Sequence, residues 1–131
     1  MKIQPDRLEG VNAIHRHETG RVWVNAQPHE GSVLVPWQGQ VRVWPVTQLQ
    51  QLAPTHFEQV LELSPELVVF GSGAHLRFVS PALWRSLANR GIGMETMDTA
   101  AACRTYNVLA SEGRRVVAAL LIESLPAGAA A

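Results

Sequence analysis

The chain has 131 residues, of which 47% are apolar and 17% charged, which excludes a mostly disordered segment and is typical of a globular domain. Its eleven basic and eleven acidic residues cancel, so no net field attracts nucleic acid or an anionic membrane. A single cysteine, Cys103, excludes an intramolecular disulfide and a multi-cysteine metal cluster within one chain, and fits a reducing compartment.

The first ten residues lack the apolar core of a signal peptide. The longest apolar run, 116–122, is far shorter than the roughly 20 residues that span a bilayer. We therefore expect a cytoplasmic protein without membrane insertion. Residues 1–123 are expected to form one globular domain and residues 124–131 a flexible C-terminal tail.

The first half of the chain is predicted to form antiparallel strands. Apolar and polar residues alternate over 11–17 and again over 21–27, and Gly20 between them can adopt a positive φ. The same alternation predicts strands over 31–37 and 40–46. This pattern indicates an antiparallel, meander-like part.

The second half alternates helices with strands. Thr55 and Glu58 have the spacing of a capping box, which predicts a helix over 55–63. The other expected elements are a strand over 66–70, a helix over 81–90 between the N-cap Ser80 and Gly91, a strand over 92–97, a helix over 99–112 and a strand over 115–122. The order predicts a single three-layer α/β domain, with a mixed central sheet flanked by helices plus an N-terminal antiparallel β part.

Two glycines, Gly71 and Gly73, flank Ser72 directly after the buried strand. A phosphate-binding loop runs straight into a helix, whereas residues 74–79 intervene here. The glycines therefore favour a tight strand exit. Ligands of open α/β sheets usually lie at the carboxyl ends of strands, so a second interpretation stays open. In it, Gly71, Gly73, His75 and Arg77 line a binding crevice.

Other polar residues have structural explanations beside functional ones. Ser72, His75 and Asp98 have the residue types of a catalytic triad, but only geometry identifies one. Asp98 or Thr99 is expected to cap the helix over 99–112. Cys103, on the apolar face of that helix, is expected to be a small core residue.

Asn107 lies near the inward face of the same helix, where a buried amide must find partners. We expect it to tie the helix to a neighbouring loop, with the turn at 71–73 as one candidate and a ligand as the alternative. His15 and His17 are two residues apart, so both are expected on one solvated strand face. No third ligand has a convincing spacing, and we expect no metal site.

Several motifs in order resemble those of a known family. They are Gly71 and Gly73 after a strand, then Asp98, Thr99, Ala102, Cys103, Thr105, Tyr106, Asn107, Glu112, Gly113 and Arg114 before a last apolar strand. Over residues 66–122 the chain resembles a family of small, largely uncharacterised proteins. That family includes the mitochondrial complex I assembly factor 3 and an adipogenesis-associated domain protein. The resemblance implies a three-layer α/β domain, no established enzyme activity, and action through protein partners.

Unlike the mitochondrial relatives, the chain is expected to carry no targeting segment, so it looks like a bacterial member. Our first hypothesis is a non-catalytic protein-binding or respiratory-complex-assembly-type factor, monomeric or weakly homo-oligomeric, without cofactor, metal or nucleic acid. The alternative is a small-anion-binding protein or enzyme. Both would use a groove between the glycine turn and the last helix. The residues expected there are Gly71, Ser72, Gly73, His75, Arg77, Asp98 and Asn107, and none is assigned as catalytic.

Overall fold

Two β-sheets organise residues 10–123, the part of the chain that the computed structural model describes. The small sheet is antiparallel and contains β1 (Ile14–Glu18), β2 (Arg21–Val24) and β3 (Gln27–Glu30). The central sheet has the strand order β5-β4-β8-β6-β7. Its strands are β4 (Val33–Pro36), β5 (Arg42–Val43), β6 (Leu67–Gly71), β7 (Gly93–Met97) and β8 (Val116–Leu120).

The central sheet is mixed. β6 runs parallel to both β8 and β7, whereas β4 is antiparallel to β8 and β5. Parallel neighbours need long crossover connections, and helices fill them. The helices are η1 (Leu49–Gln51), α1 (Pro54–Leu61), η2 (Pro81–Trp84), α2 (Arg85–Ala88) and α3 (Thr99–Ser111). The predicted α/β fold class is confirmed.

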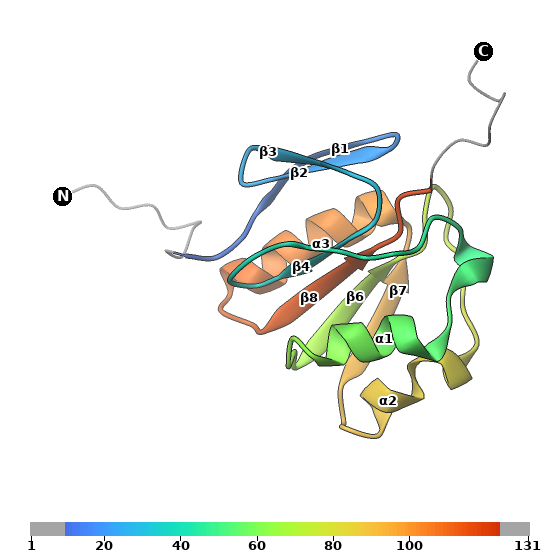
Figure 1. Cartoon of the computed structure of the whole chain (residues 1–131). Coiled ribbons are helices and arrows are strands. Elements are labelled where there is room, and N and C mark those ends of the chain that lie inside the picture. Colours follow the sequence, from blue (N-terminus) through green and yellow to red (C-terminus); the bar gives the residue numbers. More distant parts are fainter. Residues whose placement is uncertain (1–9, 124–131) are drawn as a thin grey trace, which may run out of the picture.

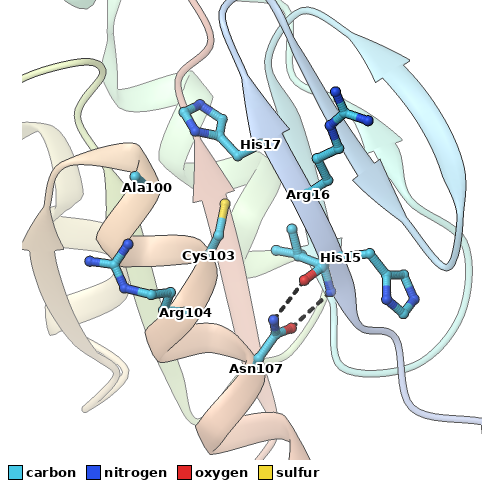
Figure 2. A pocket seen from close by; sticks show the side chains of 8 residues that line it. His15, Arg16, His17, Ala100, Cys103, Arg104 and Asn107 are labelled. Atoms are coloured by element: carbon cyan, nitrogen blue, oxygen red, sulfur yellow. Dashed lines mark hydrogen bonds between the residues drawn. The ribbon is translucent and has the colours of Figure 1, made fainter.

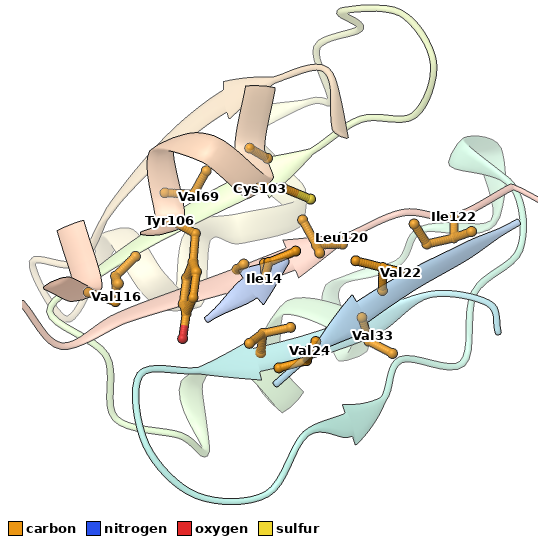
Figure 3. Close-up of a cluster of buried hydrophobic side chains, with 14 residues drawn as sticks. Ile14, Val22, Val24, Val33, Val69, Cys103, Tyr106, Val116, Leu120 and Ile122 are labelled. Atoms are coloured by element: carbon orange, nitrogen blue, oxygen red, sulfur yellow. The ribbon is translucent and has the colours of Figure 1, made fainter. Parts of the chain in front are cut away.

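Helices on both faces of the central sheet create three layers (Figure 1). α1 and α2 cover one face, and α3 together with the small sheet covers the other. The pleat of β8 serves both sides, because Ala118 and Leu120 pack toward α3 whereas Val117 and Ala119 pack toward α1. In the α3-side cluster, Val22 of the small sheet meets side chains of α3 and β8 (Figure 3).

Trp44 anchors the core on the α1 side. Its ring packs edge to face against Phe57 and Phe70, with centroids 5.7 and 6.1 Å apart. Its indole Nε1 donates to the carbonyl of His56 at 3.0 Å, so the buried polar atom is satisfied. This cluster fixes α1 against the sheet.

Three local expectations need correction. α1 begins at Pro54 rather than after Thr55, and the imidazole of His56 accepts the N–H of Ala53, so the predicted capping box does not form. The predicted strand over 21–27 ends at Val24, because Asn25 and Ala26 adopt positive φ and turn the chain into β3. The helix expected from Ser80 divides into η2 and α2.

Between residues 10 and 123, every helix is too short or too polar to cross a membrane. The expected tail over 124–131 lies outside the described residues, as do residues 1–9 of the expected domain.

Candidate functional site

The exit from β6 requires glycine at two positions for two reasons. A Cβ on Gly71 would lie 2.9 Å from the Thr99 Cα, so the first glycine permits close contact with α3. Gly73 has φ +107, a conformation that L side chains rarely adopt. This agrees with the interpretation of a tight strand exit.

Ser72 is fully buried, and its hydroxyl is used inside the loop. Oγ donates to the main-chain carbonyl of His75 at 2.8 Å and accepts the N–H of Arg77 at 2.9 Å. The hydroxyl therefore bonds the backbone of His75 and not its imidazole. The serine closes a turn, and the triad that the residue types allowed is not assembled.

Arg77 points back toward the protein. Its Nη2 donates to the carbonyl of Ser72 at 2.6 Å and to Oε1 of Glu123 at 2.5 Å, and its Nε also donates to Ser72 at 3.2 Å. Both side chains of the ion pair are largely buried, with 35% of Arg77 and 25% of Glu123 exposed. Arg77 thus braces the loop against the chain that leaves β8, with its cation committed to Glu123.

Thr99 joins three segments at the start of α3. Its Oγ1 accepts the N–H of Gly73 and donates to the carbonyl of Leu121, each at 2.9 Å. Asp98 accepts the N–H of Ala101 at 2.9 Å, which confirms Asp98 as the cap. The amides of Ser72 and Gly73 already donate, to Met97 and Thr99, so neither is free to hold an anion.

Asn107 lies about two turns further along α3 and contacts a different segment. Its Oδ1 accepts the N–H of Ile14 at 2.8 Å, and its Nδ2 donates to the carbonyl of Ile14 at 2.7 Å. The amide ties α3 to β1 and not to the turn at 71–73. The predicted site therefore splits, with Asn107 apart from the other six residues.

A groove does lie between β1 and α3 (Figure 2). One pocket of about 220 Å³ is lined by residues 14–17 together with Ala100, Cys103, Arg104 and Asn107. A second pocket of about 120 Å³ lies between Thr19, Gly73, Thr99 and Glu123. His17 lines both pockets, so the two adjoin at this residue.

A bulge in β1 separates the two histidines that alternation placed on one face. Ile14 pairs with Val24 but Arg16 pairs with Trp23, so one extra residue enters β1. His17 consequently faces α3, whereas His15 points away from it, and the shared-face expectation is wrong (Figure 2). Within residues 10–123 no group of three His, Cys, Asp or Glu side chains is placed to hold a metal ion.

Electrostatics in the groove disfavour a reactive thiol. Desolvation by burial raises the pKa of Cys103 to about 11, so the thiol is neutral at physiological pH. At His17, desolvation against the groove lowers the pKa of the imidazole, and the Asp98 carboxylate opposes that shift. Cys103 belongs to the buried α3-side cluster, as expected (Figure 3).

Sequence reasoning missed two exposed apolar residues on the loop over 74–79. Leu76 is 53% exposed and Phe78 is 75% exposed. Both flank Arg77, whose side chain turns inward to Ser72 and Glu123. The signal was present in the alternation of Leu76, Arg77 and Phe78, but the prediction used only His75 and Arg77 of this loop.

Comparisons with known proteins agree with this fold. A family model described as "Protein of unknown function (DUF498/DUF598)" matches residues 14–121. An uncharacterised protein of Rhodobacter capsulatus is 38% identical over 112 residues, which cover 86% of either chain. A Bordetella pertussis protein described as an Mth938-like domain superposes with a TM-score of 0.81 at 30% identity, covering 95% of this chain and 96% of that one.

A relative with a functional name matches over a shorter stretch. NADH dehydrogenase (ubiquinone) 1 alpha subcomplex assembly factor 3 of Bos taurus is 38% identical over 80 residues. These cover 60% of this chain and 44% of that protein, so the chain spans less than half the length of this relative. The family match over residues 14–121 confirms the predicted resemblance, and the chain belongs to the DUF498/DUF598 family of proteins of unknown function.

Proposed function

We propose that the chain is a non-catalytic protein-binding factor of the assembly type, which holds its partner on the loop over 74–79. One observation carries the proposal. Phe78 is 75% exposed and Leu76 53% exposed, although Arg77 between them is bonded to Ser72 through both its backbone N–H and its guanidinium. A mobile loop can fold its apolar side chains back, whereas this one holds them in solvent.

The physics of association favours such a loop as a contact. Burying an exposed Phe or Leu side chain stabilises a complex by roughly 1.5–3 kcal/mol. Association also costs entropy when loops become ordered, and a loop that is already braced avoids part of that cost. Arg77 supplies the brace through Ser72 and Glu123.

The non-catalytic part of the proposal is supported by the state of the two nucleophiles in this region. The hydroxyl of Ser72 is used by His75 and Arg77 within its own loop. The thiol of Cys103 is buried, with its pKa raised to about 11. A nucleophile is activated by an adjacent base, a lowered pKa or a metal ion. Ser72 bonds only backbone groups and the pKa of Cys103 is raised, so neither side chain shows the first two kinds of activation.

The relative named as an assembly factor indicates the kind of partner. We propose a protein subunit that awaits incorporation into a larger complex, with a respiratory complex as the first case to test. A bacterial source and a cytoplasmic location remain predictions. So do the expectations of no nucleic-acid partner and of a monomer or weak oligomer.

The decisive test replaces Phe78 and compares it with a matched residue elsewhere. Phe78→Ser and Val43→Ser each remove one highly exposed apolar side chain, and Val43 lies on β5 with 79% exposure. Quantitative mass spectrometry of proteins co-purified from cells of the source organism should show a partner with wild type and Val43→Ser. The Phe78→Ser variant should lose that partner.

Equal recovery by both variants would refute the contact at Phe78. Arg77→Glu is a poor probe of direct contact, because it would place a second carboxylate beside Glu123 and release the loop. Loss of a partner in that variant would show only that the loop conformation held by Arg77 matters, and not that Arg77 contacts the partner.

A further inference from the structure

β7 forms a free edge of the central sheet. It is the last strand in the order β5-β4-β8-β6-β7, and within residues 10–123 no strand pairs with its outer side. β7 extends over five residues, whereas β5 at the opposite edge has two. A free edge of this length is a template for another strand, and natural proteins usually cover or charge it.

The hydrogen bonds identify which backbone groups of β7 face outward. The N–H of Ser72 donates to the carbonyl of Met97 at 2.8 Å, so the backbone of Met97 faces β6. Backbone groups alternate in direction along a strand. The N–H and carbonyl groups of Met94 and Thr96 therefore point away from β6. They offer two donors and two acceptors to an added strand.

Glu95 lies between these two residues and opposes pairing with a second copy of the chain. The antiparallel register that uses all four outward groups pairs Met94 with Thr96 of the other copy. Glu95 then stands directly opposite Glu95, and like charges in that position are destabilising. Glu95 is exposed and forms no ion pair within the described residues.

We propose that the outer edge of β7 accepts an extended segment of a partner protein that carries Lys or Arg opposite Glu95. Main-chain hydrogen bonds to Met94 and Thr96 provide the attachment. The cation opposite Glu95 provides the selectivity, because opposite charges in a cross-strand pair attract and an acidic segment is repelled.

This inference rests on the proposed function and names how the partner is held. Two hydrogen bonds join the C-terminal end of β7 to the start of the loop that carries Phe78. The N–H of Ser72 bonds Met97 at the end of β7, and the N–H of Thr99 bonds the carbonyl of Gly73 at 2.8 Å. A segment added along the outer side of β7 therefore lies one strand away from the root of the loop over 74–79, at the same end of the sheet.

The test uses two synthetic peptides, the capped sequences TVKVT and TVEVT, which differ only in their central charge. Titration into the ¹⁵N-labelled full chain is followed by NMR. We expect TVKVT to shift the amide signals of Met94 and Thr96 and to bind about threefold to tenfold more tightly than TVEVT. The Glu95→Lys variant should reverse that preference. Glu112→Lys, the same change at an exposed residue after α3, should keep it.

Equal binding of both peptides, or no shift at Met94 and Thr96, would overturn the proposal. Protection of these two amides that rises with protein concentration in the absence of peptide would assign the edge to a second copy, and would also overturn it. If the peptide test fails but Phe78→Ser still loses the partner, strand addition at β7 is refuted and the contact at the loop stands. If the peptide test succeeds but Phe78→Ser keeps the partner, strand addition at β7 stands and the contact at Phe78 is refuted.

Discussion

The side chain of Asn107 bonds both backbone groups of Ile14, accepting its N–H at 2.8 Å and donating to its carbonyl at 2.7 Å. An amide side chain has the same donor and acceptor as a peptide group, so Asn107 replaces a neighbouring strand on the outer side of β1. The small sheet is thereby attached to α3 across 93 residues of sequence. Ile14 and Asn107 are part of the lining of the groove between β1 and α3.

We predict that Asn107→Asp destabilises the fold by roughly 2–3 kcal/mol, because it removes the donor and leaves a carboxylate oxygen against the carbonyl of Ile14. Asn107→Ala should cost roughly 1–2 kcal/mol, since it removes both hydrogen bonds without adding a charge. Urea unfolding measures these changes. Amide hydrogen exchange should show β1 losing protection before the central sheet.

Asn89→Asp makes the same chemical change at an exposed residue after α2 and should stay within about 0.5 kcal/mol of wild type. Equal effects of the Asp substitutions at 107 and 89 would show that the pairing with Ile14 contributes nothing to stability.

Features set by neighbours in sequence could be predicted from the sequence. Asp98 caps α3 because its carboxylate reaches the N–H of Ala101, three residues on. The turn after β6 was recognised because glycine relieves crowding where a strand ends. The three-layer α/β class followed from the alternation of strands and helices after a β-rich start, and the structure confirms it.

Contacts between residues distant in sequence could not be predicted. Arg77 was expected to face a groove, but its partner Glu123 lies 46 residues away. His15 and His17 share a face only in a regular strand. Nothing in the sequence near Ile14 indicates the bulge that separates them. The partner of Asn107 could not be predicted for the same reason, because no residue near Asn107 in the sequence indicates a contact with β1.

The contact between Gly71 and α3 gives a second prediction. Gly71→Ala should destabilise the protein by roughly 1–3 kcal/mol, since the new Cβ would meet the Thr99 Cα at 2.9 Å and α3 would have to move. Gly93→Ala is the matched control, because its Cβ would meet no atom within 4 Å. Thermal and urea unfolding should show a lower stability for Gly71→Ala than for Gly93→Ala. Equal stability of both variants would contradict the close packing of β6 on α3.

Cys103 gives a prediction about pH. Burial raises the pKa of its thiol from an ordinary value near 9 to about 11. Between these values the unfolded chain releases the thiol proton while the folded chain retains it, so the free energy of unfolding falls as pH rises. Stability from this group is fully present below pH 9 and is lost as pH approaches 11. Burial also raises the pKa of Tyr106, which titrates in the same direction.

The Cys103→Ala variant separates the two groups, because Tyr106 is present in both proteins and cancels in the difference. From pH 8 to pH 10.5 wild type should lose roughly 2 kcal/mol relative to the variant, measured by urea unfolding with a reductant present. Alkylation of the wild-type thiol by iodoacetamide should accelerate over the same interval, because only the thiolate reacts. A stability difference that stays constant from pH 8 to pH 10.5 would mean that the thiol ionises as easily in the folded protein as in the unfolded chain. The groove between β1 and α3 would then admit water to Cys103, and the thiol would again be a candidate for reactivity.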